Sequence, residues 1–132
     1  MGLGKQVVHL RNPRKPDLEP LEIEALADSG ALHLCIPASI AERLELDHLH
    51  TRRVGLADGS SVEVPYEGPL VVQVLGRECY AGAIVRGNEV LLGSVPMEDM
   101  DLWISPSLHK LVPNPASPDI PMSVAKGFRT FR

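Results

Sequence analysis

The sequence lacks the features of a membrane protein or of a nucleic-acid-binding protein. No apolar run is long enough to span a membrane, and the start at Met1–Lys5 lacks the apolar core of a signal peptide. The net charge is −4, and no long basic stripe is present. Aromatic residues are few, and we interpret Trp103 and Tyr80 as core or interface residues rather than a pair that stacks on bases. We therefore expect a cytoplasmic protein with no membrane and no nucleic-acid partner.

Residues that form cross-links or metal sites are also scarce. The two cysteines, Cys35 and Cys79, lie in apolar segments, and in a cytosolic chain two buried thiols are favoured over a disulfide. Asp47, His48 and His50 lie close together, but no second cluster of metal ligands accompanies them, which disfavours zinc. We expect neither a metal nor a cofactor.

The composition is that of one globular domain. The chain has 132 residues, of which 44% are apolar and 23% are charged, so it can bury a core of its own. From Pro113 onward, four prolines fall within nine residues and the chain ends in basic residues, a composition typical of an extended segment. We predict a domain over residues 1–115 and an extended C-terminal tail over 116–132.

Most of the chain has the pattern of short strands separated by turns. Asp58-Gly59 and Gly76-Arg77 each lie between two such strands and predict hairpins, the first with a type I′ turn. One helical turn is expected over 96–100. This spacing predicts a small all-β barrel or sandwich. The strands are expected at 6–10, 21–26, 31–36, 52–57, 60–64, 70–75, 78–85, 90–93, 101–105 and 109–112.

One segment, residues 39–44, has the pattern of a helix. Ser39 and Glu42 have the spacing of a capping box at its start. Ile40 and Leu44 lie one turn apart on the same face and are expected to pack on the barrel. This is the single helix that the sequence predicts with more than one turn.

The segment with the strongest chemical character is Asp28-Ser29-Gly30, which lies between two apolar strands. A carboxylate on a tight turn between buried strands costs free energy unless its neighbours donate hydrogen bonds to it. The tripeptide alone is compatible with a functional acid or with a solvated turn aspartate. Ser29 as a nucleophile with a histidine partner is disfavoured, because no nucleophile-elbow sequence surrounds it.

The order of the motifs resembles that of the retropepsin-like aspartic peptidases, the family of the retroviral proteases and their small bacterial relatives. The resemblance covers about residues 5–115. It implies an all-β fold, a small closed barrel of the retropepsin (acid protease) type with one short helix. The stretch 91–115 is similar to the end of bacterial members. Asp28-Ser29-Gly30-Ala31 resembles the catalytic turn of the family. Ala57-Asp58-Gly59-Ser60 resembles the tip of the flap. Leu91-Leu92-Gly93 resembles the apolar-apolar-Gly segment that crosses beneath the catalytic turn.

The resemblance also implies roles for single residues. Asp28 would be catalytic, the Ser29 hydroxyl would bond the partner's turn, and Gly30 would let a backbone N–H approach the carboxylate. Thr is commoner than Ser at position 29 of the motif, and the charged flap tip differs from the glycine-rich flaps of the viral enzymes. The residues expected to bind substrate are Ala31, Ala57, Asp58 and Gly59.

The chemistry needs two carboxyl groups that share one proton, one to take a proton from water and one to polarise the carbonyl. This chain contains a single Asp-Ser/Thr-Gly, because Asp58-Gly59-Ser60 has the wrong order. The second carboxylate must come from a second chain, so we predict a two-fold homodimer in which Asp28 faces its own copy. The predicted function is an aspartic endopeptidase acting on a peptide or protein substrate. The alternative is a non-catalytic dimeric all-β module that binds a peptide or protein with the same fold.

Overall fold

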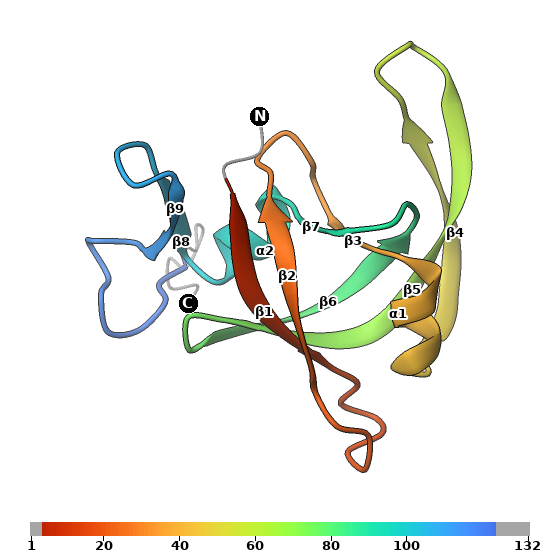
Figure 1. Ribbon diagram of the computed structural model, residues 1–132, viewed down its shortest axis with the longest axis horizontal. Helices are drawn as coiled ribbons and strands as arrows, with labels where there is room; N and C mark the ends of the chain where they lie inside the picture. Colours follow the sequence, from red (N-terminus) through yellow and green to blue (C-terminus); the bar gives the residue numbers. More distant parts are fainter. Residues whose placement is uncertain (1–3, 124–132) are drawn as a thin grey trace, which may run out of the picture.

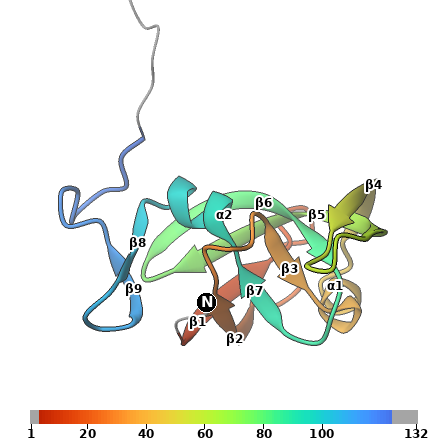
Figure 2. The same cartoon turned by 90° about the horizontal axis from the view of Figure 1, so that it is seen from above.

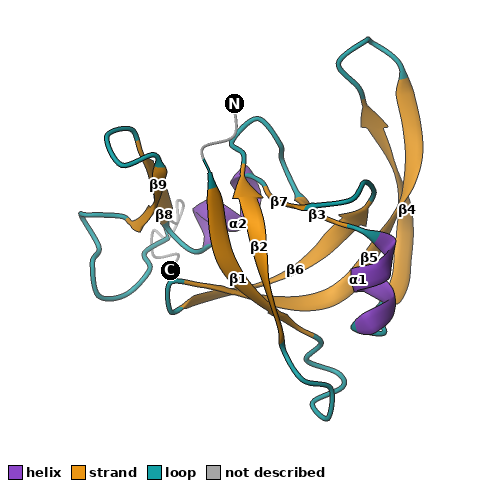
Figure 3. Ribbon diagram, in the orientation of Figure 1, coloured by secondary structure: helices purple, strands orange, loops and turns teal. Residues whose placement is uncertain are grey.

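The computed structural model describes residues 4–123, which form nine strands and two short helices (Figure 1, Figure 3). In chain order these are β1 (Lys5–Arg11), β2 (Leu21–Ala27), β3 (Leu34–Ile36), α1 (Ala38–Arg43), β4 (Asp47–Gly55), β5 (Ser61–Val74), β6 (Arg77–Val85), β7 (Val90–Leu92), α2 (Ser94–Asp99), β8 (Leu102–Ser105) and β9 (Lys110–Pro113).

Six strands close into a barrel, which confirms the predicted fold class. The main sheet has the order β1-β2-β7-β3-β6-β5-β4, and β1 also pairs with β5, so the ring closes without β4. Within residues 4–123, β4 pairs only with β5 and extends from the barrel as a hairpin, whereas β8 and β9 form a separate two-stranded sheet. The hairpin tip and the small sheet lie at opposite ends of the molecule (Figure 1, Figure 2).

The barrel encloses one apolar core. Alternate residues of its strands point inward, as the strand period requires, and each large apolar side chain that is fully buried stabilises the fold by about 1.5–3 kcal/mol. α1 covers one end of the barrel through Ile40 and Leu44, both buried, as predicted. The largest fully buried side chains include Val8, Leu10, Leu34, Ile36, Leu70, Val72, Val74, Val90, Leu92 and Met100.

The helices differ from the prediction in two respects. The turn expected over 96–100 is a second helix, α2, so the expectation of one short helix is wrong. The predicted capping box is also wrong, because α1 begins at Ala38 with Pro37 at its N-cap and no side chain caps it. Ser39 therefore lies inside the first turn of α1. At this position no free backbone N–H lies three residues ahead, so the Ser39 hydroxyl cannot cap the start of the helix.

The two hairpin turns differ from each other in backbone geometry. The predicted type I′ turn at Asp58-Gly59 is wrong, because of these two residues Gly59 alone has a positive φ, of 88°. The loop is closed instead by hydrogen bonds from the Gly59 N–H to the Leu56 carbonyl and from the Leu56 N–H to the Ser60 carbonyl. Two consecutive positive φ values occur instead at Leu75 and Gly76, one residue before the predicted centre of the second hairpin. A five-residue connection gives the first hairpin a wider tip than a two-residue turn would.

Several side chains lie elsewhere than expected. Trp103 and Tyr80 are 53% and 68% exposed, so the core interpretation is wrong for both, and the interface interpretation stays a prediction. Cys79 is buried and Cys35 half-buried, and both are free thiols. Within residues 4–123, no helix has the length and apolar character needed to cross a membrane.

Candidate active site

The Asp28 turn is held from below by the barrel. β2 pairs in parallel with β7, with Ala27 beside Leu92, and the next N–H, that of Asp28, donates to the Leu92 carbonyl at 3.0 Å. The Gly30 N–H donates to Asp28 Oδ1 at 2.9 Å, which confirms the close approach expected of that glycine. Within the described chain this is the one hydrogen bond to the half-buried Asp28 carboxylate, so its remaining lone pairs are available to water or a ligand.

The apolar-apolar-Gly segment passes directly beneath the turn, as the resemblance implies. A Cβ at Gly93 would overlap the backbone of Leu32 and His33, so no other residue fits this crossing without a backbone shift. The Ser94 N–H donates to the Ala31 carbonyl at 2.8 Å. These contacts replace strand pairing for residues 31–33, which is why β3 begins at Leu34 rather than at Ala31 as predicted.

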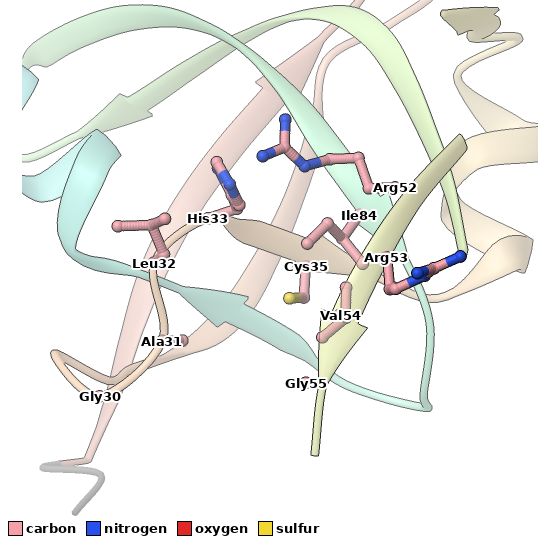
Figure 4. A pocket seen from close by; sticks show the side chains of 10 residues that line it. All are labelled: Gly30, Ala31, Leu32, His33, Cys35, Arg52, Arg53, Val54, Gly55 and Ile84. Atoms are coloured by element: carbon pink, nitrogen blue, oxygen red, sulfur yellow. The ribbon is translucent and has the colours of Figure 1, made fainter. Parts of the chain in front are cut away.

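A groove with a volume of about 400 Å³ lies between the Asp28 turn and the outer strand β4 (Figure 4). Ala31 lines it, together with Gly30 from the turn itself, and the predicted binding of substrate by Ala31 stays a prediction. The predicted substrate-binding residues of the hairpin tip do not line it, because the β4 wall of the groove ends at Gly55. The lining residues are Gly30, Ala31, Leu32, His33, Cys35, Arg52, Arg53, Val54, Gly55 and Ile84.

The hairpin tip is a self-contained exposed turn. The Ser60 N–H donates to Asp58 Oδ1 at 2.9 Å, and the Ser60 hydroxyl donates to the same oxygen. Both hydrogen bonds lower the pKa of the Asp58 carboxyl, the one from the hydroxyl most. Ala57 and Gly59 are exposed beside it. In the single chain, Asp58 therefore stabilises its own turn, and its contact with substrate stays a prediction.

A cluster of two rings and one cation lies next to the groove, and its cation, Arg52, lines the groove itself. The Tyr66 ring packs closely against Gly82 of β6, where a Cβ would overlap the ring. His50 stacks on the Tyr66 ring with centroids 4.8 Å apart, and the Arg52 guanidinium carbon lies 5.3 Å from the ring centroid. This cation–π contact positions a cation beside the groove.

His33 faces the same cluster from β3's side of the groove. Its ring meets the Tyr66 ring edge-on, with centroids 5.9 Å apart. Burial lowers the pKa of His33 and the positive charge of Arg52 lowers it further, so the imidazole is neutral near pH 7. Its Nε2 is buried and has no hydrogen-bond partner within residues 4–123. Burial raises the pKa of the neighbouring Cys35 thiol, which is therefore protonated.

Sequence reasoning missed His33, Arg52 and Tyr66 as residues of the site. Part of the signal was present, because in the strand predicted over 31–36 His33 and Cys35 share one face, and both line the groove. Arg52 and Val54 alternate in the same way along β4. The missing information was the pairing that brings β4 across from the turn.

A second hollow lies on the other side of the Asp28 turn. Its volume is about 320 Å³, and its walls are mostly apolar. Ser29 lies at its edge, and Trp103 of β8 contributes the largest exposed ring. The lining residues are Ser29, Ser94, Met97, Glu98, Leu102, Trp103 and Ile104. Within residues 4–123, no group of three His, Cys, Asp or Glu side chains is arranged to hold a metal ion.

The barrel is similar to solved structures of retroviral proteases. It matches the solution structure of simian foamy virus (mac) protease with a TM-score of 0.52 and 18% identity, over 71% of this chain and 91% of that one. It matches EIAV protease complexed with the inhibitor HBY-793 with a TM-score of 0.55 and 18% identity, over 74% and 86% of the two chains. No family model and no curated protein matches the sequence. The likeness confirms the retropepsin-type fold, and the bacterial-type assignment stays a prediction.

Proposed function

We propose that this protein is an aspartic endopeptidase in which Asp28 and its copy from a second chain activate a water molecule. The observation that carries the proposal is the state of the Asp28 carboxylate. It lies on a turn fixed by the Leu92 carbonyl, next to a groove, and accepts one described hydrogen bond, from Gly30. The retropepsin-type fold supports this assignment, because the solved structures that share it are those of proteases.

The proposed mechanism uses one proton shared by two carboxyl groups. Like charges held close together cannot both ionise easily, so one Asp28 is protonated while the other is not. The ionised group takes a proton from water, and the resulting hydroxide attacks the peptide carbonyl, whose oxygen accepts a hydrogen bond from the protonated group. The C–N bond then breaks as a proton is returned to the leaving amine. No step requires a metal or a cofactor.

The second hollow supports a homodimer. Ser29 lies at its edge, so a two-fold axis that brings Asp28 against its copy also brings a second chain close to this hollow. Trp103 is 53% exposed there, and a large ring on an apolar surface is typical of the centre of an interface. In this arrangement the Ser29 hydroxyl bonds the turn of the partner, and Trp103 packs against the partner's surface.

The groove and the hairpin supply the binding of an extended peptide. The peptide lies along the groove beside Gly30 and Ala31, and its backbone pairs with backbone groups of the protein. The β4–β5 hairpin acts as a flap that closes over the bound peptide. Its tip, Ala57-Asp58-Gly59, contacts the peptide in the closed position.

A peptide library incubated with the protein between about pH 4 and pH 7 tests the proposal, since a shared-proton dyad acts in this range. We expect cleavage by the natural protein and a loss of about 10²–10⁴-fold with Asp28→Asn, which keeps the size of the side chain. Cleavage that survives in Asp28→Asn would overturn the dyad. Absence of cleavage by both proteins, with the dimer intact, would instead identify a peptide-binding module.

Sedimentation tests the dimer on its own. We expect a dimer at micromolar concentrations, and we expect Trp103→Ser to weaken the dimer by at least about tenfold in Kd. Tyr80→Ser is the matched control, because Tyr80 is a still more exposed aromatic residue (68%) but is not part of the hollow beside Ser29. A natural chain that is monomeric throughout this range would contradict the proposed site, which is incomplete without a second copy.

A further inference from the structure

We infer that the groove selects peptides that carry an acidic side chain close to the cleaved bond, and that Arg52 is the specificity-determining residue. The inference rests on the proposed function and names the substrate class of the same site.

Arg52 presents its charge to the groove. It is one of the residues that line the groove, it is half-buried, and its side chain points toward His33 (Figure 4). The Tyr66 ring beneath the guanidinium is fixed by its contact with Gly82 and by the stacked His50. A cation held in one orientation loses less entropy on binding a carboxylate than a free surface side chain does.

The charge of Arg52 has no acidic partner in the part of the chain that the structure describes. The next residue, Arg53, differs in this respect, because its guanidinium pairs with Glu63 at 3.2 Å across the hairpin. Among the described residues, none that lines the groove is an aspartate or a glutamate. A partly desolvated cation in an opening without counter-charge favours an anionic ligand group.

The remaining walls indicate that this anionic group belongs to a peptide. Leu32, Val54 and Ile84 contribute apolar surface to the same groove, and its lower edge is the Asp28 turn. An extended peptide presents side chains alternately to two sides, so it can place an apolar residue against these walls and an acidic residue against Arg52. The Arg52 guanidinium lies next to the Tyr66 ring and is charged over the whole pH range of peptide cleavage, so it supplies a permanent positive charge at this side of the groove.

The test compares sets of fluorogenic peptides that differ only by Glu, Gln or Lys at each position on either side of the cleaved bond, at about pH 6, where a Glu side chain is ionised. We expect the natural protein to cleave the better Glu peptide at least about tenfold faster in kcat/KM than its Gln partner. We expect Arg52→Gln to reduce this ratio to about one, Arg52→Lys to keep part of it, and Arg52→Glu to favour Lys peptides. Arg14→Gln removes the same charge from an exposed turn and is expected to leave the ratio unchanged.

Binding separates this inference from the proposed function. The Asp28→Asn protein is titrated with the same Glu and Gln peptides by fluorescence anisotropy, with and without the Arg52→Gln change. Cleavage with equal rates for the Glu and Gln peptides would overturn the acidic preference and leave the peptidase in place. Absence of cleavage, together with Arg52-dependent binding of the Glu peptide, would overturn the peptidase and support the preference. Equal binding of both peptides would overturn the preference, whatever the state of cleavage.

Discussion

Two half-buried aspartates, Asp28 and Asp101, have opposite surroundings. Asp28 accepts one described hydrogen bond, from Gly30. Asp101 accepts from the Asn114 side chain at 2.9 Å, from the Met122 N–H at 3.0 Å and from the Ser117 hydroxyl. A carboxylate whose lone pairs are occupied by fixed donors is a structural element, whereas one with free lone pairs can bind water or a substrate.

The surroundings of Asp101 also hold a buried cation. Arg77 is 6% exposed, lies 3.8 Å from the Asp101 carboxylate, and donates to the backbone carbonyls of Met100, Asp101 and Ser117. The hydrogen bonds from Ser117, Asn114 and Met122, and to a smaller extent the charge of Arg77, lower the pKa of Asp101 to about 2. This cluster ties the segment 114–122 to the end of α2. The comparison therefore separates an aspartate used for stability from one left open for chemistry.

The largest expected effect is a loss of stability when the chain crossing that supports the Asp28 turn is disturbed. Gly93→Ala places a methyl group against the backbone of Leu32 and His33, which cannot move aside as a side chain can. We expect a loss of about 1–3 kcal/mol in the free energy of unfolding, measured by denaturant titration, together with reduced peptide cleavage. Gly55→Ala is the control for stability, because no atom lies within 4 Å of a Cβ there. Equal stability of the two variants would show that the crossing beneath Asp28 is loose.

The next effect is on Asp101 itself. Asp101→Asn keeps the side-chain size, and asparagine tolerates the positive φ of 56° at this position. The variant places an amide N–H₂ group against hydrogen-bond donors, and it leaves the buried Arg77 without a nearby negative charge. We expect the Tm to fall by several degrees and the kcat/KM of the folded protein to change little. Asp119→Asn, in the same segment and exposed, serves as the control. An unchanged Tm would contradict the structural assignment of Asp101.

The contribution of Asp101 to stability should also be measurable in the natural protein at acid pH. The folded-state pKa of Asp101 lies below the usual 3.8, so its contribution to stability is complete above about pH 4 and is lost as the pH falls toward about 2. We expect the free energy of unfolding to fall more steeply over this window in the natural protein than in Asp101→Asn, measured by urea titration at several pH values. Parallel curves would contradict the lowered pKa.

The smallest effect concerns the groove beside Asp28. Burial and the charge of Arg52 both lower the pKa of His33 from the usual 6.5. We expect the NMR titration of His33 to have its midpoint below this value, and Arg52→Gln to raise the midpoint without restoring it fully, since burial is the larger cause. A midpoint that does not move would show that the two side chains do not share one part of the groove.

Much of the fold followed from local patterning. Alternation in β2 and the apolar segments of β6 and β7 identified strands, and Ile40 and Leu44 identified the face of α1 that packs on the barrel. The failures were those of geometry at element ends. The start of α1 and the turn type at Gly59 depend on how neighbouring elements constrain the backbone, which residue types alone do not specify.

The candidate site was predicted only in part for a related reason. Asp28 and Gly30 are close in sequence, and the family resemblance of this stretch implied that a backbone N–H approaches the carboxylate, as the Gly30 N–H does. Arg52 and Tyr66 meet the Asp28 side of the molecule only through the pairing of β4 with β5 and of β5 with β6. No local signal encodes that approach. The domain boundary at residue 115 and the role of the hairpin tip stay predictions.

The sequence by itself therefore indicated a small all-β barrel or sandwich and the position of its one Asp-Ser-Gly turn, because strand period and turn composition act over a few residues. The retropepsin-type barrel was implied only by the resemblance of the ordered motifs to that family. The tertiary structure decided which side chains surround that turn. It placed Gly93 beneath the turn and Trp103 beside Ser29, and it bound Asp101 into a network of donors. Across the groove it placed Arg52, a cation without an acidic partner among residues 4–123. These choices depend on strand register between distant segments, which is set by burial in the assembled barrel.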